Sequence, residues 1–158
     1  MRYVDLSPNG AAYIPIYLAS SDGKTMVKTM FLLDTGATRT TINFKMLSKL
    51  GYTKEWVEEN KIILSESEKP MLADGRKLNA YGIPAIRMSI SGHEVFHNDY
   101  FITSDEAPNL GFLLGADILS YFDIFFKYSE WRAYFEFRED RIKRPSKPGD
   151  SFAYAVDN

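Results

Sequence analysis

The chain has 158 residues, of which 45% are hydrophobic and 15% are aromatic, a composition that excludes intrinsic disorder and suits one globular domain with its own core. A formal net charge of −2 gives no electrostatic reason to expect nucleic acid or an anionic membrane as a partner, and the absence of cysteine excludes disulfides and thiol catalysis. The sequence has no apolar core of a signal peptide near its start and no apolar run long enough to cross a membrane, so we expect a cytoplasmic protein.

Turn residues end the first ten positions, so we expect residues 1–10 to form an N-terminal segment and the ordered fold to start at Ala11. Two β-prone runs joined by a turn then predict a hairpin, with its strands at 13–18 and 25–33 and its turn at 20–23. Pro15 lacks a backbone N–H, which favours an edge position or a bulge for the first of these strands. The second strand leads directly to Asp34.

Apolar spacing predicts a short helix over residues 44–50, and Gly51 is typical of the residue that follows a helix C-terminus. The next stretch is mixed and predicts a helical turn at 56–60, a strand at 62–64 and a polar loop at 65–70. The dipeptide Asp74-Gly75, placed between apolar residues, indicates a two-residue hairpin turn.

Alternation of apolar and polar residues predicts a strand at 86–90 with one solvated face, a turn at Gly92 and a return strand at 95–102, followed by a loop at 105–109. The last elements expected are a short helix at 117–121 and a hairpin with strands at 124–126 and 133–137. Many short strands and two short helices indicate an all-β, barrel-like domain. Residues 139–158 are expected to form a solvated polar tail; a phosphate-binding tail is the alternative, although acidic residues offset its basic ones.

Two motifs carry the chemistry. The first is an apolar run that ends in Asp34-Thr35-Gly36-Ala37-Thr38; taken alone, it is also typical of an ordinary turn. The second runs from Phe112 to Leu119 and contains Leu114, Gly115 and Asp117. Together they resemble the retropepsin-like aspartic protease family, and in particular its bacterial single-domain members, over roughly residues 11–137.

The resemblance implies a closed, barrel-like acid-protease fold with one or two short helices, in a domain that spans residues 11–138. It also implies a homodimer with one Asp-Thr-Gly in each protomer, in which Asp34 is catalytic, Thr35 bridges across the twofold axis and Gly36 lines the substrate backbone. A β-hairpin of that family, the flap, closes over the peptide. Here its residues would be Asp74, Gly75, Arg76 and Tyr81, although an aromatic residue on a strand, such as Tyr81, is usually a core residue.

The chemistry of paired aspartates needs two carboxyl groups close enough to share one proton, because like charges at short range push their pKa values apart. The chain carries one Asp-Thr-Gly. Asp117 opens a predicted helix and is expected to cap its N-terminus, while Asp74 and Asp123 belong to a predicted turn and strand. The second carboxylate must therefore come from another copy, and a twofold dimer places Asp34 opposite Asp34.

Some features depart from the family or favour other interpretations. Retroviral members carry an intrachain ion pair near the two motifs, and the nearest positions here are Thr38, Arg39 and Ala116, so that pair is absent or replaced. His93 and His97 would lie about 13 Å apart along a strand, too far to share one metal, so we expect no metal or cofactor. The alternatives to a protease that acts on peptides or proteins are a catalytically silent domain for peptide binding, protein binding or dimerisation, and a structural module in which Asp34 is a turn residue.

Overall fold

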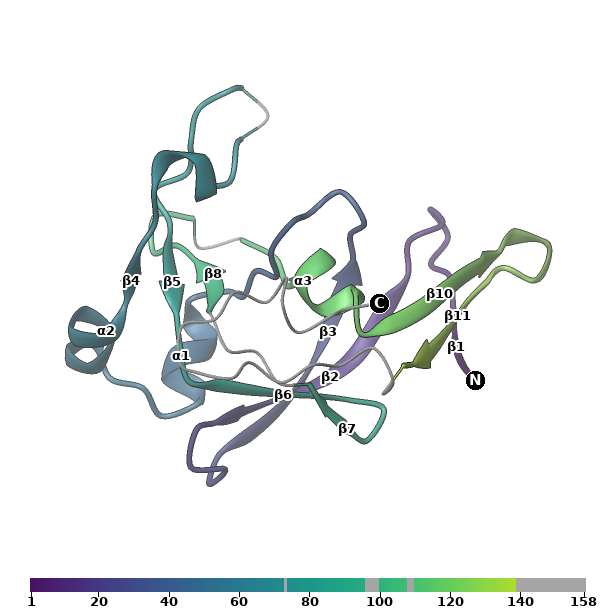
Figure 1. The fold of residues 1–158 in the computed structure, drawn as a ribbon, viewed down its shortest axis with the longest axis horizontal. Helices are drawn as coiled ribbons and strands as arrows, with labels where there is room; N and C mark the ends of the chain where they lie inside the picture. Colours follow the sequence, from purple (N-terminus) through teal and green to yellow (C-terminus); the bar gives the residue numbers. More distant parts are fainter. Residues whose placement is uncertain (73, 96–99, 108–109, 139–158) are drawn as a thin grey trace.

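The computed structural model describes residues 1–72, 74–95, 100–107 and 110–138. The strands in this part of the chain are β1 (Arg2–Asp5), β2 (Tyr13–Ser20), β3 (Met26–Leu33), β4 (Ile62–Ile63), β5 (Tyr81–Ile83), β6 (Ile86–Ile90), β7 (His93–Val95), β8 (Phe101–Thr103), β9 (Leu113–Leu114), β10 (Phe122–Lys127) and β11 (Arg132–Phe137). The helices are α1 (Lys45–Lys49), α2 (Lys54–Asn60) and α3 (Ala116–Leu119), with 3₁₀ turns η1 (Glu66–Glu68) and η2 (Tyr128–Glu130). The fold is mostly β, as predicted, with three short α-helices in the described residues rather than one or two (Figure 1).

Three groups of hydrogen-bonded strands make up the described part of the fold. The central sheet has the order β7-β6-β2-β3-β9, and two smaller sheets have the orders β4-β5-β8 and β1-β11-β10. All neighbouring strands are antiparallel except β3 and β9, which are parallel. These sheets are open, so the expected closure into a barrel does not occur among the described strands.

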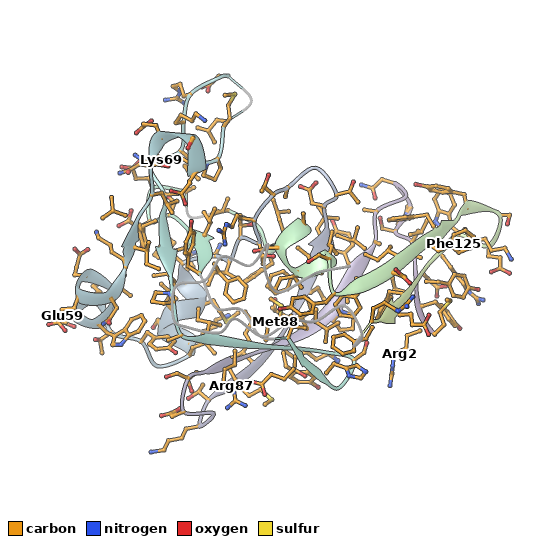
Figure 2. All side chains as sticks on the ribbon, in the orientation of Figure 1. Arg2, Glu59, Lys69, Arg87, Met88 and Phe125 are labelled. Atoms are coloured by element: carbon orange, nitrogen blue, oxygen red, sulfur yellow. The ribbon has the colours of Figure 1, made fainter. Side chains whose placement is uncertain are left out.

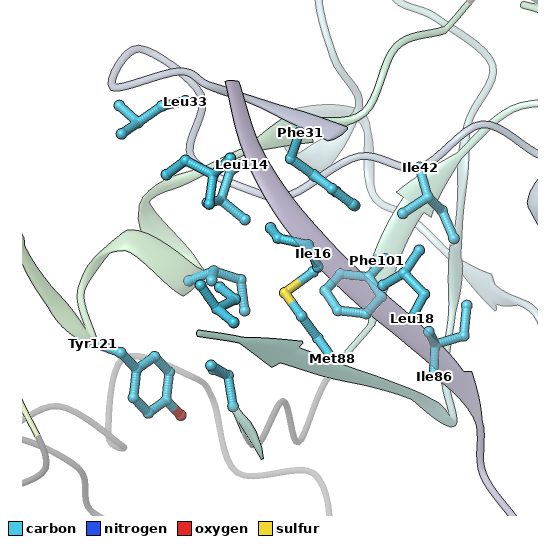
Figure 3. Close-up of a cluster of buried hydrophobic side chains, with 14 of the residues drawn as sticks. Ile16, Leu18, Phe31, Leu33, Ile42, Ile86, Met88, Phe101, Leu114 and Tyr121 are labelled. Carbon is cyan, nitrogen blue, oxygen red and sulfur yellow. The ribbon is translucent and has the colours of Figure 1, made fainter. Parts of the chain in front are cut away.

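Alternation along β2 builds the core, because every second side chain of a strand points to the same face. Ile14, Ile16 and Leu18 are buried there and belong to a cluster that includes residues of β3, β6 and β9 (Figure 3). Burying a side chain of this size contributes about 1.5–3 kcal/mol. Pro15 pairs with β3 only, since the pairing of β2 with β6 begins at Ile16, so the proline lies in an edge-like part of the strand.

The N-terminal residues are part of the fold, which corrects the expectation that ordered structure starts at Ala11. β1 pairs antiparallel with β11. Beyond β1, the Leu6 N–H donates to the carbonyl of Trp131 at 2.8 Å, and the Trp131 ring N–H donates to the carbonyl of Ser7 at 3.1 Å. The turn cluster after residue 6 therefore lies within the domain and does not precede it.

The predicted helices are present. α1 is followed by Gly51 with φ +90°, a left-handed conformation that glycine adopts without strain. α2 begins earlier than the expected helical turn, because the Thr53 side chain accepts a hydrogen bond from the Trp56 N–H and caps the helix. The loop expected at 65–70 contains η1, which Ser65 and Glu68 cap reciprocally.

The prediction of a single return strand at 95–102 is wrong. β7 pairs with β6 after a tight turn in which Ser91 and Gly92 have φ +52° and +82°, whereas β8 pairs with β5 in a different sheet. Residues 96–99, which include His97, and the tail 139–158 lie outside the described residues, so the predictions made for them stay predictions. No helix in the described part of the chain combines the length and the apolarity needed to cross a membrane.

Candidate active site

Asp34 follows β3 at the point where the two motifs meet. β3 and β9 pair in parallel, with Leu32 opposite Leu113 and Leu33 opposite Leu114. The Asp34 N–H donates to the carbonyl of Leu114 at 3.1 Å and continues this ladder by one residue. The apolar run before Asp34 thus anchors its backbone to the second motif.

The residues after Asp34 form a tight turn that closes on the carboxylate. The Gly36 N–H donates to Asp34 Oδ1 at 3.0 Å, and the Ala37 N–H donates to the Asp34 carbonyl at 3.1 Å. Asp34 is half-buried, whereas Thr35, Gly36 and Thr38 are exposed. The turn therefore fixes one carboxylate oxygen and presents its outer side to solvent, where a second protein surface can reach it.

Helix α3 supports this turn from the inside. The Ala116 N–H donates to the carbonyl of Ala37 at 2.8 Å, and the Asp117 N–H donates to the carbonyl of Thr38 at 3.2 Å. The first N–H groups of a helix have no partner within the helix, so the turn supplies acceptors that α3 lacks. The Asp34 turn and α3 therefore satisfy each other's backbone groups.

Asp117 is not the N-cap of α3, which corrects the sequence-based expectation; Gly115 occupies that position. The Asp117 side chain is buried and accepts hydrogen bonds from the Thr40 N–H at 3.0 Å and from the Thr40 hydroxyl at 2.7 Å. A buried carboxylate needs such donors, since an unpaired charge away from water is costly. Its role is to tie α3 to the chain that leaves the Asp34 turn.

Gly115 permits a close approach that a larger residue would prevent. A Cβ atom at this position would lie 2.6 Å from the carbonyl carbon of Arg39 and 2.8 Å from its oxygen. The Gly115 N–H also donates to the Thr40 hydroxyl at 3.1 Å. The glycine of the second motif is thus explained by backbone packing against residues 39 and 40.

A cluster that sequence reasoning did not identify lies beside the turn. The Arg39 guanidinium lies 4.4 Å from the centre of the Tyr100 ring, and the Tyr100 hydroxyl donates to the Glu68 carboxylate. That hydrogen bond, followed by those from Ser65, holds the pKa of Glu68 below its ordinary value. Gly82 is the one sequence feature that indicated the position of Tyr100, because a glycine within a strand often marks a close approach of another group. A Cβ atom at Gly82 would lie 2.6 Å from the Tyr100 ring.

The hairpin predicted around Asp74-Gly75 is present. The Leu72 N–H donates to the carbonyl of Arg76 at 2.7 Å, the Gly75 N–H donates to the carbonyl of Leu72 at 2.9 Å, and Gly75 has φ +87°. Arg76 and Asp74 form an exposed ion pair at 2.6 Å. Figure 1 shows that this hairpin projects from the molecule beyond β4 and β5.

Tyr81 does not lie in that hairpin. It belongs to β5, where it is opposite Thr103, and its half-buried ring packs against the main core. Burial raises the pKa of its phenol, and the Lys61 ammonium lies 5.2 Å from the ring centre. The core interpretation of Tyr81 fits this position better than a place in the flap.

A cavity of about 570 Å³ separates the Asp34 turn from the base of the hairpin. Its lining comes from three parts of the chain: the turn and the segment after it, the η1 region, and the sheet floor, namely Gly36, Ala37, Thr38, Arg39, Thr41, Ser67, Glu68, Lys69, Pro70, Met71, Ile102 and Leu113. Asp34 is not among the lining residues, although the turn that it begins forms one wall. The volume is in the range of ligand-binding pockets, about 300–1,000 Å³.

Candidate metal ligands do not gather in the described residues, where no group of three or more histidines, cysteines, aspartates and glutamates is placed to hold an ion. His93 instead stacks on Phe137, with ring centres 4.2 Å apart. The candidate site therefore consists of a carboxylate, backbone donors and a cavity.

Comparison with known proteins gives a match at the level of structure. The fold is similar to a retropepsin-like aspartic protease from Rickettsia conorii, at 20% identity over 85% of this chain and 97% of that chain, with a TM-score of 0.57. It is also similar to EIAV protease in complex with the inhibitor HBY-793, at 16% identity over 73% of this chain and 91% of that chain, with a TM-score of 0.50. No protein-family model and no curated protein matches the sequence. The chain therefore has a retropepsin-like fold.

Proposed function

We propose that the chain is an aspartic endopeptidase that acts as a homodimer, with Asp34 of each protomer in one shared catalytic pair. The observation that carries the proposal is the Asp34 turn, which is clamped from inside by α3 and exposed on its outer side. The retropepsin-like fold supports the same conclusion. A single carboxylate at the surface cannot perform this chemistry, so the turn is half of a site.

The chemistry follows from two carboxyl groups that share one proton. The ionised Asp34 takes a proton from a water molecule held between the pair, while the protonated partner donates a hydrogen bond to the substrate carbonyl as negative charge develops on it. The Gly36 N–H holds one oxygen of Asp34, which orients the carboxylate. Thr35 would bridge to the partner protomer, and Gly36 would line the substrate backbone.

The cavity beside the turn would accommodate substrate side chains. Its opposite wall is the η1 region at the base of the hairpin, so a peptide in it would pass between the Asp34 turn and the projecting hairpin. Asp74, Gly75 and Arg76 would then form the flap tip, where the exposed Arg76 could contact the peptide.

The test compares the wild type with Asp34→Asn on an unbiased peptide library, with cleavage read by mass spectrometry across pH. Asparagine keeps the size of the side chain but cannot ionise, so cleavage should fall by several orders of magnitude while the fold persists. Activity of the wild type should peak in acid, where the pair holds one proton. Asp105→Asn, in an exposed loop, is the matched control and should cut like the wild type. Equal cleavage by the wild type and Asp34→Asn would remove Asp34 from catalysis.

One observation favours a second candidate function, a catalytically silent domain that binds peptides. The cavity is lined by residues that follow Asp34 but not by Asp34 itself, so it could hold a peptide without placing it on the carboxylate. An intact dimer that binds peptides from the library but cuts none at any pH would support this function.

A further inference from the structure

The projecting hairpin around Gly75 joins the molecule next to η1, and Figure 2 shows Lys69, the residue that follows η1, at its foot. The stem of the hairpin is closed by the Leu78 N–H, which donates to the carbonyl of Pro70 at 2.8 Å. The residues of η1 are exposed, yet they form part of one wall of the cavity. The position of this wall therefore depends on the contacts that hold η1 to the rest of the domain.

The Glu68 carboxylate holds η1 through both of its oxygens. One oxygen accepts the hydrogen bond from the Tyr100 hydroxyl, and the other accepts hydrogen bonds from the Ser65 hydroxyl at 2.8 Å and the Ser65 N–H at 3.2 Å. The bonds to Ser65 are local and cap the 3₁₀ turn. The bond to Tyr100 spans 32 positions of the sequence and reaches a residue that is only 7% exposed. Tyr100 therefore anchors η1 in the body of the domain.

Close packing fixes the Tyr100 ring. β5 approaches it so closely that a Cβ atom at Gly82 would lie 2.6 Å from two ring atoms. The Arg39 guanidinium lies over the ring, 4.4 Å from its centre. The ring also belongs to a second hydrophobic cluster, whose other buried members are Leu64, Leu78, Ala80 and Ile102. The Tyr100 hydroxyl is thus a fixed point to which η1 is attached.

Arg39 connects Tyr100 to the segment that leaves the Asp34 turn. Its neighbour Thr40 is buried and donates its N–H and its hydroxyl to a carboxylate of α3, at 3.0 and 2.7 Å. The Thr40 carbonyl accepts a hydrogen bond from the N–H of Ile102, two residues after Tyr100, at 3.0 Å. Side-chain and backbone contacts therefore join Tyr100 to the same short segment beside the turn.

We propose that Arg39, Tyr100 and Glu68 are positioning residues, which form a clamp that fixes η1 and the projecting hairpin relative to the Asp34 turn and so holds the two walls of the cavity in place for a peptide. The clamp contributes no group to the proton transfers. Its effect on cleavage rests on the proposed function, whereas the clamp itself is a property of the fold. Walls that are already ordered reduce the entropy lost on binding, so the clamp favours peptide binding and not the chemical step.

The clamp is suited to the acidic range in which the proposed pair of aspartates works. Hydrogen bonds to an ionised acceptor are stronger than those to a neutral one. The Tyr100 hydroxyl, followed by the Ser65 hydroxyl and N–H, holds the pKa of Glu68 below its ordinary value, and the charge of Arg39 acts in the same direction. Glu68 therefore stays ionised at pH values where an ordinary glutamate begins to take up its proton.

Hydrogen exchange tests the clamp independently of catalysis. Tyr100→Phe keeps the ring and removes the hydroxyl that bonds Glu68. The amides of η1 and of the hairpin stem, such as that of Leu78, should then exchange at least about threefold faster, because losing a hydrogen bond to a charged group favours local opening. The amides of β2 and β6 should exchange as in the wild type. Unchanged exchange in η1 and the hairpin stem would overturn the proposal.

Tyr134→Phe is the matched control, because it also removes a tyrosine hydroxyl that donates to a glutamate, in this case Glu130 at 2.5 Å. Tyr134 pairs with Phe125 across β11 and β10, and Figure 2 shows Phe125 far from Lys69. Exchange in η1 and the hairpin stem should therefore stay as in the wild type. If Tyr134→Phe accelerated this exchange as much as Tyr100→Phe does, the effect would not arise from the clamp and the proposal would be overturned.

Cleavage kinetics test what the clamp does for the proposed protease. In Tyr100→Phe, KM should rise by about fivefold or more while kcat stays within about twofold, because a loss of binding that is equal in the ground state and the transition state raises KM alone. Tyr134→Phe should keep both constants. A merely structural role would lower the amount of folded enzyme, and hence the apparent kcat, without changing KM. That result would overturn the proposal.

Glu68→Ala removes the same hydrogen bond from its other end. If Glu68 and Tyr100 act as one unit, adding Tyr100→Phe to Glu68→Ala should raise KM no further, whereas independent effects that multiply would overturn the proposal. Faster exchange in Tyr100→Phe together with no peptide cleavage by the wild type would support the clamp and refute the protease, so the two failures are distinguishable.

Discussion

Asp117 and Thr40 are 77 positions apart in the sequence, yet the Asp117 carboxylate accepts both the backbone N–H and the hydroxyl of Thr40, at 3.0 and 2.7 Å. Both residues are buried, and the Thr40 hydroxyl also accepts a hydrogen bond from the Gly115 N–H. The candidate catalytic turn is thus held between β9 on one side and this buried pair on the other. The geometry of the turn therefore depends on buried residues outside the turn itself.

Removing this carboxylate should destabilise the protein. Asp117→Ala leaves the N–H and hydroxyl of Thr40 buried without this acceptor, and a lost hydrogen bond to a charged group costs about 1.5–3 kcal/mol. We therefore expect the free energy of unfolding, measured with urea, to fall by roughly 2–4 kcal/mol when the bonds to both donors are lost. Asp105→Ala, at an exposed position, should change it by less than about 0.5 kcal/mol. A similar loss in the two variants would show that the Asp117–Thr40 contact has no special weight.

A methyl group at Gly115 should have a comparable effect for a steric reason. The Cβ of Gly115→Ala would lie 2.6 Å from the backbone of Arg39, so α3 or the segment after the Asp34 turn must shift. Such overpacking costs about 1–3 kcal/mol. Gly111→Ala is the matched control, because no heavy atom lies within 4 Å of its Cβ position. Differential scanning calorimetry of both variants should show a lower melting temperature for Gly115→Ala alone, and equal melting temperatures would contradict the packing argument.

The sequence predicted those parts of the site that a short stretch of neighbouring residues defines. An apolar strand that ends in Asp34 and a glycine in the second motif are visible locally, and the structure places them side by side. The role of Asp117 was assigned wrongly because its donors lie at Thr40, far away in the sequence. The cluster of Arg39, Glu68 and Tyr100 could not be predicted for the same reason, because its members come from three segments that are far apart in the sequence.

The errors in the fold have a related cause. The residues of β1 precede a cluster of turn residues and look like an unattached segment, but their partner is β11 at the other end of the chain. The predicted strand 95–102 combined two runs of β-prone residues that pair with different sheets through β7 and β8. Propensity identifies a strand, whereas its neighbours follow from tertiary packing.

Glu68 should make stability depend on pH. Its pKa in the folded protein is lowered by the Tyr100 hydroxyl, so the folded state binds its proton less readily than the unfolded state does. The stabilisation is therefore present above the ordinary pKa of the group, 4.5, and is lost as the pH falls through the lower folded value. In thermal melts from pH 7 to pH 3, the stability advantage of the wild type over Glu68→Gln should shrink in this acidic range.

The control for this titration is Glu66→Gln. It removes a carboxylate from the same 3₁₀ turn, but the Glu66 carboxylate pairs with Lys69 and not with Tyr100. The difference in stability between the wild type and Glu66→Gln should not shrink over this pH range in the way that the difference between the wild type and Glu68→Gln does. If the two variants gave the same dependence on pH, the contact between Glu68 and Tyr100 would not be its source.

Mixing active and inactive subunits should reveal whether two copies share one site. When the wild type is unfolded and refolded with an equal amount of Asp34→Asn, random pairing leaves about a quarter of the dimers with both aspartates. If both carboxylates are needed, peptide cleavage should fall to about a quarter of the value for an equal total amount of wild type. A site complete in each protomer would instead retain about a half, and this outcome would refute the shared pair. Mixing with Asp105→Asn controls for losses on refolding and should leave activity unchanged.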